Sequence, residues 1–74
     1  MDMLEVIFSK YGKMMLRTNE VAELTGRSES MLVKDRMEGV GAPYIKMGKG
    51  HSATVYYPLN ELVQWIEEKQ IKTA

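Results

Sequence analysis

The spacing of apolar residues predicts a helix near each end of the chain. Leu4, Ile7, Phe8 and Tyr11 share one face of a short helix that ends near Gly12. This face either packs on the core or forms a dimer contact, and no motif decides between the two. Near the other end, a helix over residues 59–69 starts after a proline and carries its apolar side chains on one face: Leu59, Leu62, Val63 and Ile66.

Two further helices are predicted in the first half of the chain, joined by a very short turn. Thr18 suits the N-cap of a helix over residues 19–25, and Gly26 suits its end. Arg27 alone separates Gly26 from Ser28, the expected N-cap of a helix over residues 29–38. Helices joined by so short a turn cross steeply. Within the second helix, Leu32 and Met31 are expected to face inward.

Residues 40–44 follow Gly39 and contain a second glycine and a proline, which predicts a loop. The alternation over residues 44–47 and the β-branched and aromatic residues at 54–57 predict two strands around a turn at 48–52. Leu16 is either a short strand or a core anchor. We therefore expect a mainly α fold with a small β-hairpin, in the order α-α-β-β-α with an extra N-terminal helix.

Composition narrows the class of protein. The chain has 74 residues, 45% of them hydrophobic, which suits one small core and not a disordered tail. It has no cysteine, no signal-peptide pattern and no apolar run of about 20 residues. These features favour the cytoplasm, here of a bacterial or phage-infected cell, and no membrane partner. Net charge is zero, but residues 9–51 hold eight basic and five acidic side chains, so the middle is mildly basic.

Three segments resemble the excisionase-like small winged helix-turn-helix proteins of phages and mobile elements. They are LRTNEVAELTGRSESML, RMEGVGAPYIKMGKG and VYYPLNELVQWIEE, which together span most of residues 16–68. The resemblance implies a DNA-binding domain at 15–69 and leaves residues 1–14 unexplained. From the apolar spacing we expect a helical extension at 1–14, and the last residues, 70–74, are expected to form a frayed tail. Two residues depart from the family pattern: Arg27, where an apolar side chain is usual, and Asp35, where a bulky apolar residue is usual. The hairpin KGHSAT is also less basic than is common in the family.

Proteins of this kind bind double-stranded DNA and do no chemistry. Some act as recombination directionality factors beside an integrase, others regulate transcription, and a related module belongs to phage packaging complexes. The resemblance implies a recognition helix in the major groove and a hairpin wing on the backbone or minor groove. The few basic groups also predict weak binding by one copy, so that a homodimer or a cooperative multimer, or a partner from the integrase or transcription machinery, would assist.

The candidate DNA-binding residues come from the two helix starts, the recognition helix and the hairpin. They are Arg17, Thr18, Arg27, Ser28, Glu29, Ser30, Val33, Lys34, Lys49, His51, Ser52 and Thr54. Lys34 is the foremost candidate for a contact to guanine or phosphate. Ser28 is better explained as a cap than as a DNA contact. For Arg36 we favour a structural role, with the guanidinium paired to Asp35, Glu38 or a phosphate.

Enzymatic activity is not expected. His51 is the only histidine, and no carboxylate pair or cysteine accompanies it to form a metal or catalytic site. No cofactor is predicted. The alternative function is a protein-docking module, which the seven methionines favour because methionine adapts to varied apolar surfaces.

Overall fold

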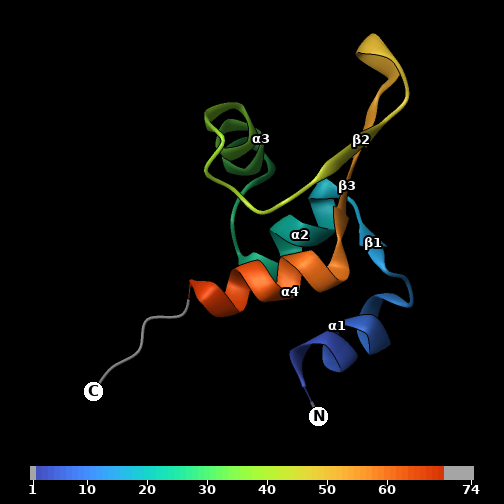
Figure 1. Cartoon of the computed structure of the whole chain (residues 1–74), viewed down its shortest axis with the longest axis vertical. Helices are drawn as coiled ribbons and strands as arrows, with labels where there is room; N and C mark the ends of the chain where they lie inside the picture. Colours follow the sequence, from blue (N-terminus) through green and yellow to red (C-terminus); the bar gives the residue numbers. More distant parts are fainter. Residues whose placement is uncertain (1, 70–74) are drawn as a thin grey trace.

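A computed structural model describes residues 2–69 and contains four α-helices and a small antiparallel sheet (Figure 1). This confirms a mainly helical chain with a small β component. The predicted frayed tail, residues 70–74, lies outside the described residues. In chain order the elements are α1 (Met3–Tyr11), β1 (Met15–Leu16), α2 (Thr18–Thr25), α3 (Glu29–Glu38), β2 (Ile45–Met47), the 3₁₀ turn η1 (Gly50–Ser52), β3 (Thr54–Pro58) and α4 (Leu59–Glu68).

Side-chain caps explain where two of these helices begin. The Asp2 carboxylate accepts a hydrogen bond from the Glu5 amide at 2.9 Å, and the Ser28 hydroxyl accepts one from the Met31 amide at 3.1 Å. The predicted cap at Ser28 is thereby confirmed. Gly26, with φ of 76°, ends α2 in the left-handed conformation, so the chain can turn at once into α3.

The predicted cap at Thr18 is wrong. Arg17 occupies the N-cap position of α2, and Thr18 is the first helical residue. Instead of a hydroxyl cap, the Glu20 carboxylate reaches back and accepts a hydrogen bond from the Arg17 amide at 2.8 Å. This is the glutamate half of a capping box, which needs no cap side chain.

The sheet has the order β1-β3-β2, and both of its pairings are antiparallel. Leu16 was expected either in a short strand or as a core anchor, and it is both. It belongs to a two-residue strand, where it pairs with Tyr57, and its side chain is fully buried. β2 and β3 pair with Lys46 opposite Val55. We call β2, η1 and β3, with the residues that join them, the hairpin.

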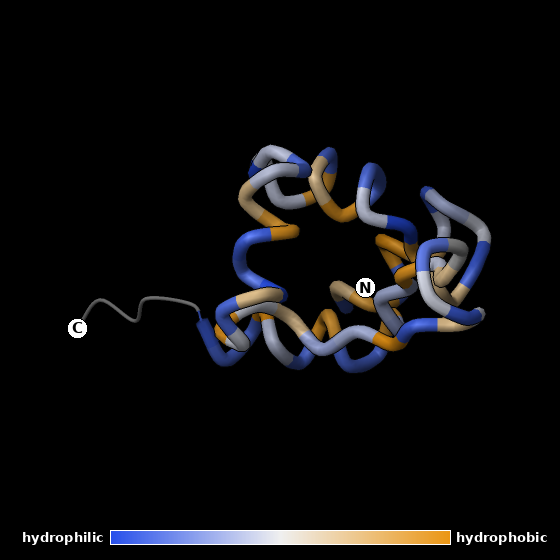
Figure 2. The backbone as a smooth tube through the Cα atoms, turned by 90° about the horizontal axis from the view of Figure 1, so that it is seen from above, coloured by the Kyte–Doolittle hydropathy of each residue, from blue (hydrophilic) through white to orange (hydrophobic). Residues whose placement is uncertain are grey.

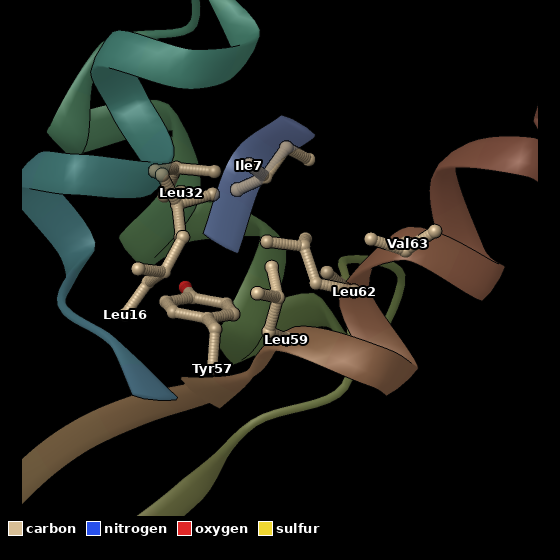
Figure 3. Packing of buried hydrophobic residues seen from close by; sticks show 9 residues of the cluster. Ile7, Leu16, Leu32, Tyr57, Leu59, Leu62 and Val63 are labelled. Carbon is tan, nitrogen blue, oxygen red and sulfur yellow. The ribbon is translucent and has the colours of Figure 1, made fainter. Parts of the chain in front are cut away.

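The core lies where α1, α2, α3 and α4 meet β1 and β3 (Figure 3). Ile7 reaches it from α1, and Leu32 reaches it from α3, as predicted. The expected burial of Met31 fails, because Met31 is 46% exposed. Phe8, whose face is expected either on the core or in a dimer contact, is 43% exposed. Each helix of this small domain offers only a narrow strip to the core, and these two side chains lie outside it. The buried residues are Ile7, Leu16, Val21, Leu32, Ala42, Tyr57, Leu59, Leu62 and Val63.

Hydropathy alternates along the helices, as Figure 2 shows, which is the pattern of helices that bury one side only. Within residues 2–69, none of the helices combines the length and apolar character that a membrane crossing requires. In Figure 1, α3 and the hairpin project toward the same end of the molecule, while α1 and α4 lie toward the other. The surface between α3 and the hairpin is therefore the place to look for the predicted site.

Candidate nucleic-acid interface

A groove of about 330 Å³ lies between the start of α2, α3 and β3. Five of the residues predicted from sequence line it together, although they are far apart in the chain. The lining residues are Arg17, Thr18, Asn19, Glu29, Val33, Arg36, Ala53, Thr54 and Val55.

A second hollow of about 280 Å³ shares Val33, Arg36, Ala53 and Val55 with the first and extends it between α3 and β2. It adds Met37, Tyr44, Lys46 and Gly50. We call the two together the α3–hairpin groove. Its walls are a helix on one side and a two-stranded ribbon on the other.

The outer side of α3 presents polar and apolar groups to solvent. Ser30 is exposed, and Val33 is 40% exposed. The Lys34 side chain is 73% exposed, and its Nζ lies 3.9 Å from the Glu38 carboxylate. An exposed pair at this distance contributes little, so Lys34 can exchange it for another anion at small cost.

The end of the hairpin is also exposed. Lys49 and His51 lie there with their side chains toward solvent, and Gly48 and Gly50 have φ of 115° and 54°. Gly50 is the first residue of η1 and adopts a left-handed conformation, which glycine tolerates without strain. Ser52 belongs to η1, but its side chain lies outside the described part of the structure.

Arg17 lies at the open edge of the groove. Its backbone is fixed by the hydrogen bond to Glu20, and its guanidinium lies 5.6 Å from the centre of the Tyr56 ring. A ring face at this distance attracts a cation and holds its stem in place without neutralising its charge. Arg17 is therefore a charged group that is positioned but still exposed to solvent.

Arg36 lies at the base of the groove, and its contacts differ from those predicted. Its Nη1 donates to the Tyr57 hydroxyl at 2.6 Å and to the Thr18 hydroxyl at 3.3 Å. The guanidinium carbon lies 5.7 Å from the Tyr44 ring centre and 5.9 Å from that of Tyr57. The structural role favoured for Arg36 is confirmed, but its partners are hydroxyls and rings and not Asp35 or Glu38.

The two departures from the family pattern compensate for each other. Arg27 Nη2 donates to Asp35 Oδ2 at 2.9 Å, with the two side chains 38% and 19% exposed. An ion pair thus joins the two positions at which the resemblance led us to expect apolar side chains. The pair lies outside the α3–hairpin groove, and Arg27 Nε is buried without a hydrogen-bond partner.

Sequence reasoning missed Lys46 and Asn19, which also line the groove. Alternation along residues 44–47 places Lys46 on the same side of the strand as Tyr44, and this signal could have identified it. Asn19 follows the predicted helix start directly. Both side chains are exposed and can donate hydrogen bonds.

Several acidic side chains are neutralised away from the groove. Glu20 Oε2 pairs with Lys13 at 2.8 Å, and Glu23 Oε1 pairs with Lys10 at 3.0 Å and accepts from the Tyr11 hydroxyl at 3.0 Å. Burial alone would raise the pKa of Glu20, but the Arg17 amide and the Lys13 ammonium lower it overall. The hydrogen bonds from Lys10 and Tyr11 lower the pKa of Glu23.

Around the groove, positive charge is in excess. Glu29 is the one acidic lining residue among those described, against Arg17, Arg36 and Lys46. Lys34 is exposed on α3, and Lys49 is exposed at the end of the hairpin. Over residues 2–69, no cluster of three or more histidine, cysteine, aspartate or glutamate residues is arranged to hold a metal ion.

No protein-family model, no curated protein and no solved structure matches this chain. The residues of the groove and their arrangement are the structural features that bear on function.

Proposed function

We propose that the chain is a winged helix-turn-helix protein that binds double-stranded DNA. α2 and α3 would form the helix-turn-helix, with α3 in the major groove, and the hairpin would form the wing on the backbone or minor groove. The observation that carries the proposal is the α3–hairpin groove, which brings Arg17, Thr18, Glu29, Val33 and Thr54 to one face.

The start of α3 has the chemistry to contact base edges. An α-helix fits the major groove of B-form DNA, and the residues near its N-terminus come closest to the bases. Glu29 can accept a hydrogen bond from cytosine, and Ser30 can bond to a base or a phosphate. Lys34 can donate to guanine, and Val33 can contact a thymine methyl group. All four side chains are exposed.

The groups flanking α3 suit phosphates. Arg17, at the start of α2, and Lys46, on the hairpin, line the groove beside α3, and Lys49 lies at the end of the hairpin. Phosphate contacts fix orientation on the duplex and supply most of the affinity. With about four such cations and one acidic residue among them, a single copy binds DNA weakly. Binding as pairs or multiples, or together with a partner protein, supplies the remaining affinity.

We further propose that the protein acts without catalysing a reaction, as a recombination directionality factor or as a small transcription regulator in the cytoplasm. An integrase or the transcription machinery would then be the protein partner. The resemblance of the segments Leu16–Leu32 and 36–50 to excisionase-like proteins supports this choice.

A protein-docking function is the second candidate, either alone or within a DNA-packaging complex. It is favoured by the apolar side chains on and after α3: Met31 is 46% exposed, Met37 is 83% exposed and Val40 is 60% exposed. Exposed methionines suit adaptable contacts with another protein. Met37 also lines the groove, so both functions would use overlapping surfaces.

Fluorescence anisotropy with a mixed pool of duplex DNA, titrated at several salt concentrations, tests the proposal. We expect binding to weaken roughly a hundredfold between about 50 and 200 mM salt, as release of counterions from about four phosphates requires. Lys34→Glu should weaken binding at least tenfold and flatten the salt dependence by about one unit of slope.

Lys69→Glu is the matched control, because it makes the same charge change at the end of α4. It should bind almost as tightly as the unmodified protein. Absence of binding at low salt by a folded sample would contradict the proposal and favour the docking function. Equal losses in the two variants would show that net charge, and not the α3 face, governs binding.

A further inference from the structure

The contacts of Arg36 join four separate segments at one guanidinium. Arg36 belongs to the last turn of α3, Thr18 begins α2, Tyr57 lies in β3, and Tyr44 precedes β2. Its two hydrogen bonds, at 2.6 and 3.3 Å, and its two ring contacts therefore cross from α3 to α2 and to the hairpin.

The geometry points to Arg36 as a positioning residue that sets the distance and angle between α3 and the hairpin. For the proposed DNA binding, on which this consequence rests, it would fix which base edges and which phosphates can be contacted together. Nothing in the sequence resemblance assigns this role to Arg36.

Three features of the site support positioning. Nη1 carries two N–H groups, and its two acceptors use both of them, which fixes the rotation of the planar guanidinium. Tyr57 is only 1% exposed, so the hydroxyl that holds Arg36 is itself anchored in the core. Within residues 2–69, Arg36 forms no ion pair with a carboxylate, so its orientation is set by these hydroxyls and rings.

A lysine at position 36 could not make the same set of contacts. Its ammonium is a point charge on a flexible stem, whereas guanidinium is a planar fork that can stack on a ring while it donates to two acceptors. The contacts of Arg36 use both properties. The role thus depends on the shape of the group and not only on its charge.

Distances between two spin labels, measured without DNA, test the inference directly. The chain has no cysteine, so Glu38→Cys on α3 and His51→Cys on the hairpin give two unique and exposed labelling positions. In this background, Thr18→Val and Tyr57→Phe together remove both hydroxyls and leave the ring and nearly the same volume. We expect this double variant, and Arg36→Lys, to give a broader or displaced distance distribution.

Tyr56→Phe is the matched control, because it makes the same change one residue earlier on β3. No hydrogen bond of the Tyr56 hydroxyl occurs in the part of the chain that the structure describes, so its distribution should stay unchanged. A distribution in the Thr18→Val/Tyr57→Phe protein that matches the parent would overturn the inference, provided that circular dichroism shows both to be folded.

Anisotropy then separates this inference from the proposed function. Tyr57→Phe should weaken binding to the mixed duplex pool roughly tenfold without changing the salt slope, since a charged hydrogen bond is lost but no phosphate contact. If the unmodified protein binds no DNA, the proposed function fails, and the label distances still decide whether Arg36 positions the hairpin.

Discussion

At the scale of single residues, the ion pair between Arg27 and Asp35 is the feature that the family pattern did not anticipate. Either residue alone would place a charge at a half-buried position between the α2–α3 turn and α3. Together they neutralise each other through one hydrogen bond, although Arg27 Nε stays buried without a partner among the described residues. Packing is also close between Gly41 and Asp35, because a Cβ atom at Gly41 would lie 2.8 Å from the Asp35 Cβ. Gly41 is thus required for space and not for an unusual φ.

This arrangement predicts that the two residues are coupled. Arg27→Met or Asp35→Leu alone should lower the free energy of unfolding by about 1–3 kcal/mol, because each leaves a partly buried charge without its partner. The double variant should recover most of this loss, since two apolar side chains can pack where the pair stood. Urea denaturation of the four proteins measures the coupling.

A double-mutant cycle at the exposed pair Lys34–Glu38, on the same helix, is the matched control. Because its atoms are 3.9 Å apart and both side chains are more than half exposed, its coupling should be near zero. Additive losses in the Arg27/Asp35 cycle would show that the pair contributes nothing specific. The ion pair also means that a charge reversal at Arg27 would test stability, so Lys34 is the better residue for testing DNA binding.

Sequence patterns predict single residues well where one local rule decides the outcome. Ser28 caps α3, and Leu32 is buried, because each depends on spacing within one helix. The partners of Arg36 and Arg27 depend on which segments meet in space, and no periodicity contains that information. Met31 is a similar case, since its exposure reflects how much of α3 the rest of the chain covers.

At the scale of elements, α1 is held to the rest of the chain by one buried side chain, by partly buried side chains packed against the core and by a group of charges. Ile7 enters the core, and Lys10, Lys13 and Tyr11 bridge from α1 and the segment after it to Glu20 and Glu23 on α2. The helices themselves were predicted almost to the residue. Strand β1 was left open between two interpretations, because two residues are too few to show an alternating pattern.

The lowered pKa values of Glu20 and Glu23 predict a loss of stability in acid. Groups whose pKa is lower in the folded chain stabilise it above their ordinary value, about 4.5, and this contribution disappears as the pH falls through the folded pKa. We expect the free energy of unfolding to be level from about pH 5 to 7 and to fall steadily below that range.

Replacing these carboxylates should reduce the loss of unfolding free energy as the pH falls into the acid range. Glu20→Gln/Glu23→Gln should lose stability near neutral pH but change less between pH 5 and 3, as followed by urea denaturation at each pH. Glu61→Gln is the control, because Glu61 forms no ion pair within residues 2–69, and its curve should parallel that of the unmodified protein. Parallel curves for all three proteins would contradict the assignment.

At the scale of the whole molecule, the two ends differ in kind. One end carries α3, the hairpin and an excess of exposed cations, and the other carries α1 and α4 (Figure 1). A net charge of zero conceals this asymmetry. The mainly helical architecture followed from hydrophobic spacing, and five predicted site residues do share one groove. Lys46 could have been found from the alternation along its strand, whereas the place of Asn19 in the groove depends on the folded arrangement.

Mapping the DNA contact on the folded protein tests the central claim most directly. Backbone amide signals of the ¹⁵N-labelled protein would be followed by NMR while a duplex pool is added at low salt. We predict shifts concentrated at the start of α2, along α3 and over the hairpin, with little change in α1 and α4. Shifts confined to α1 and α4, or no shifts from a folded sample, would contradict DNA binding through the α3–hairpin groove.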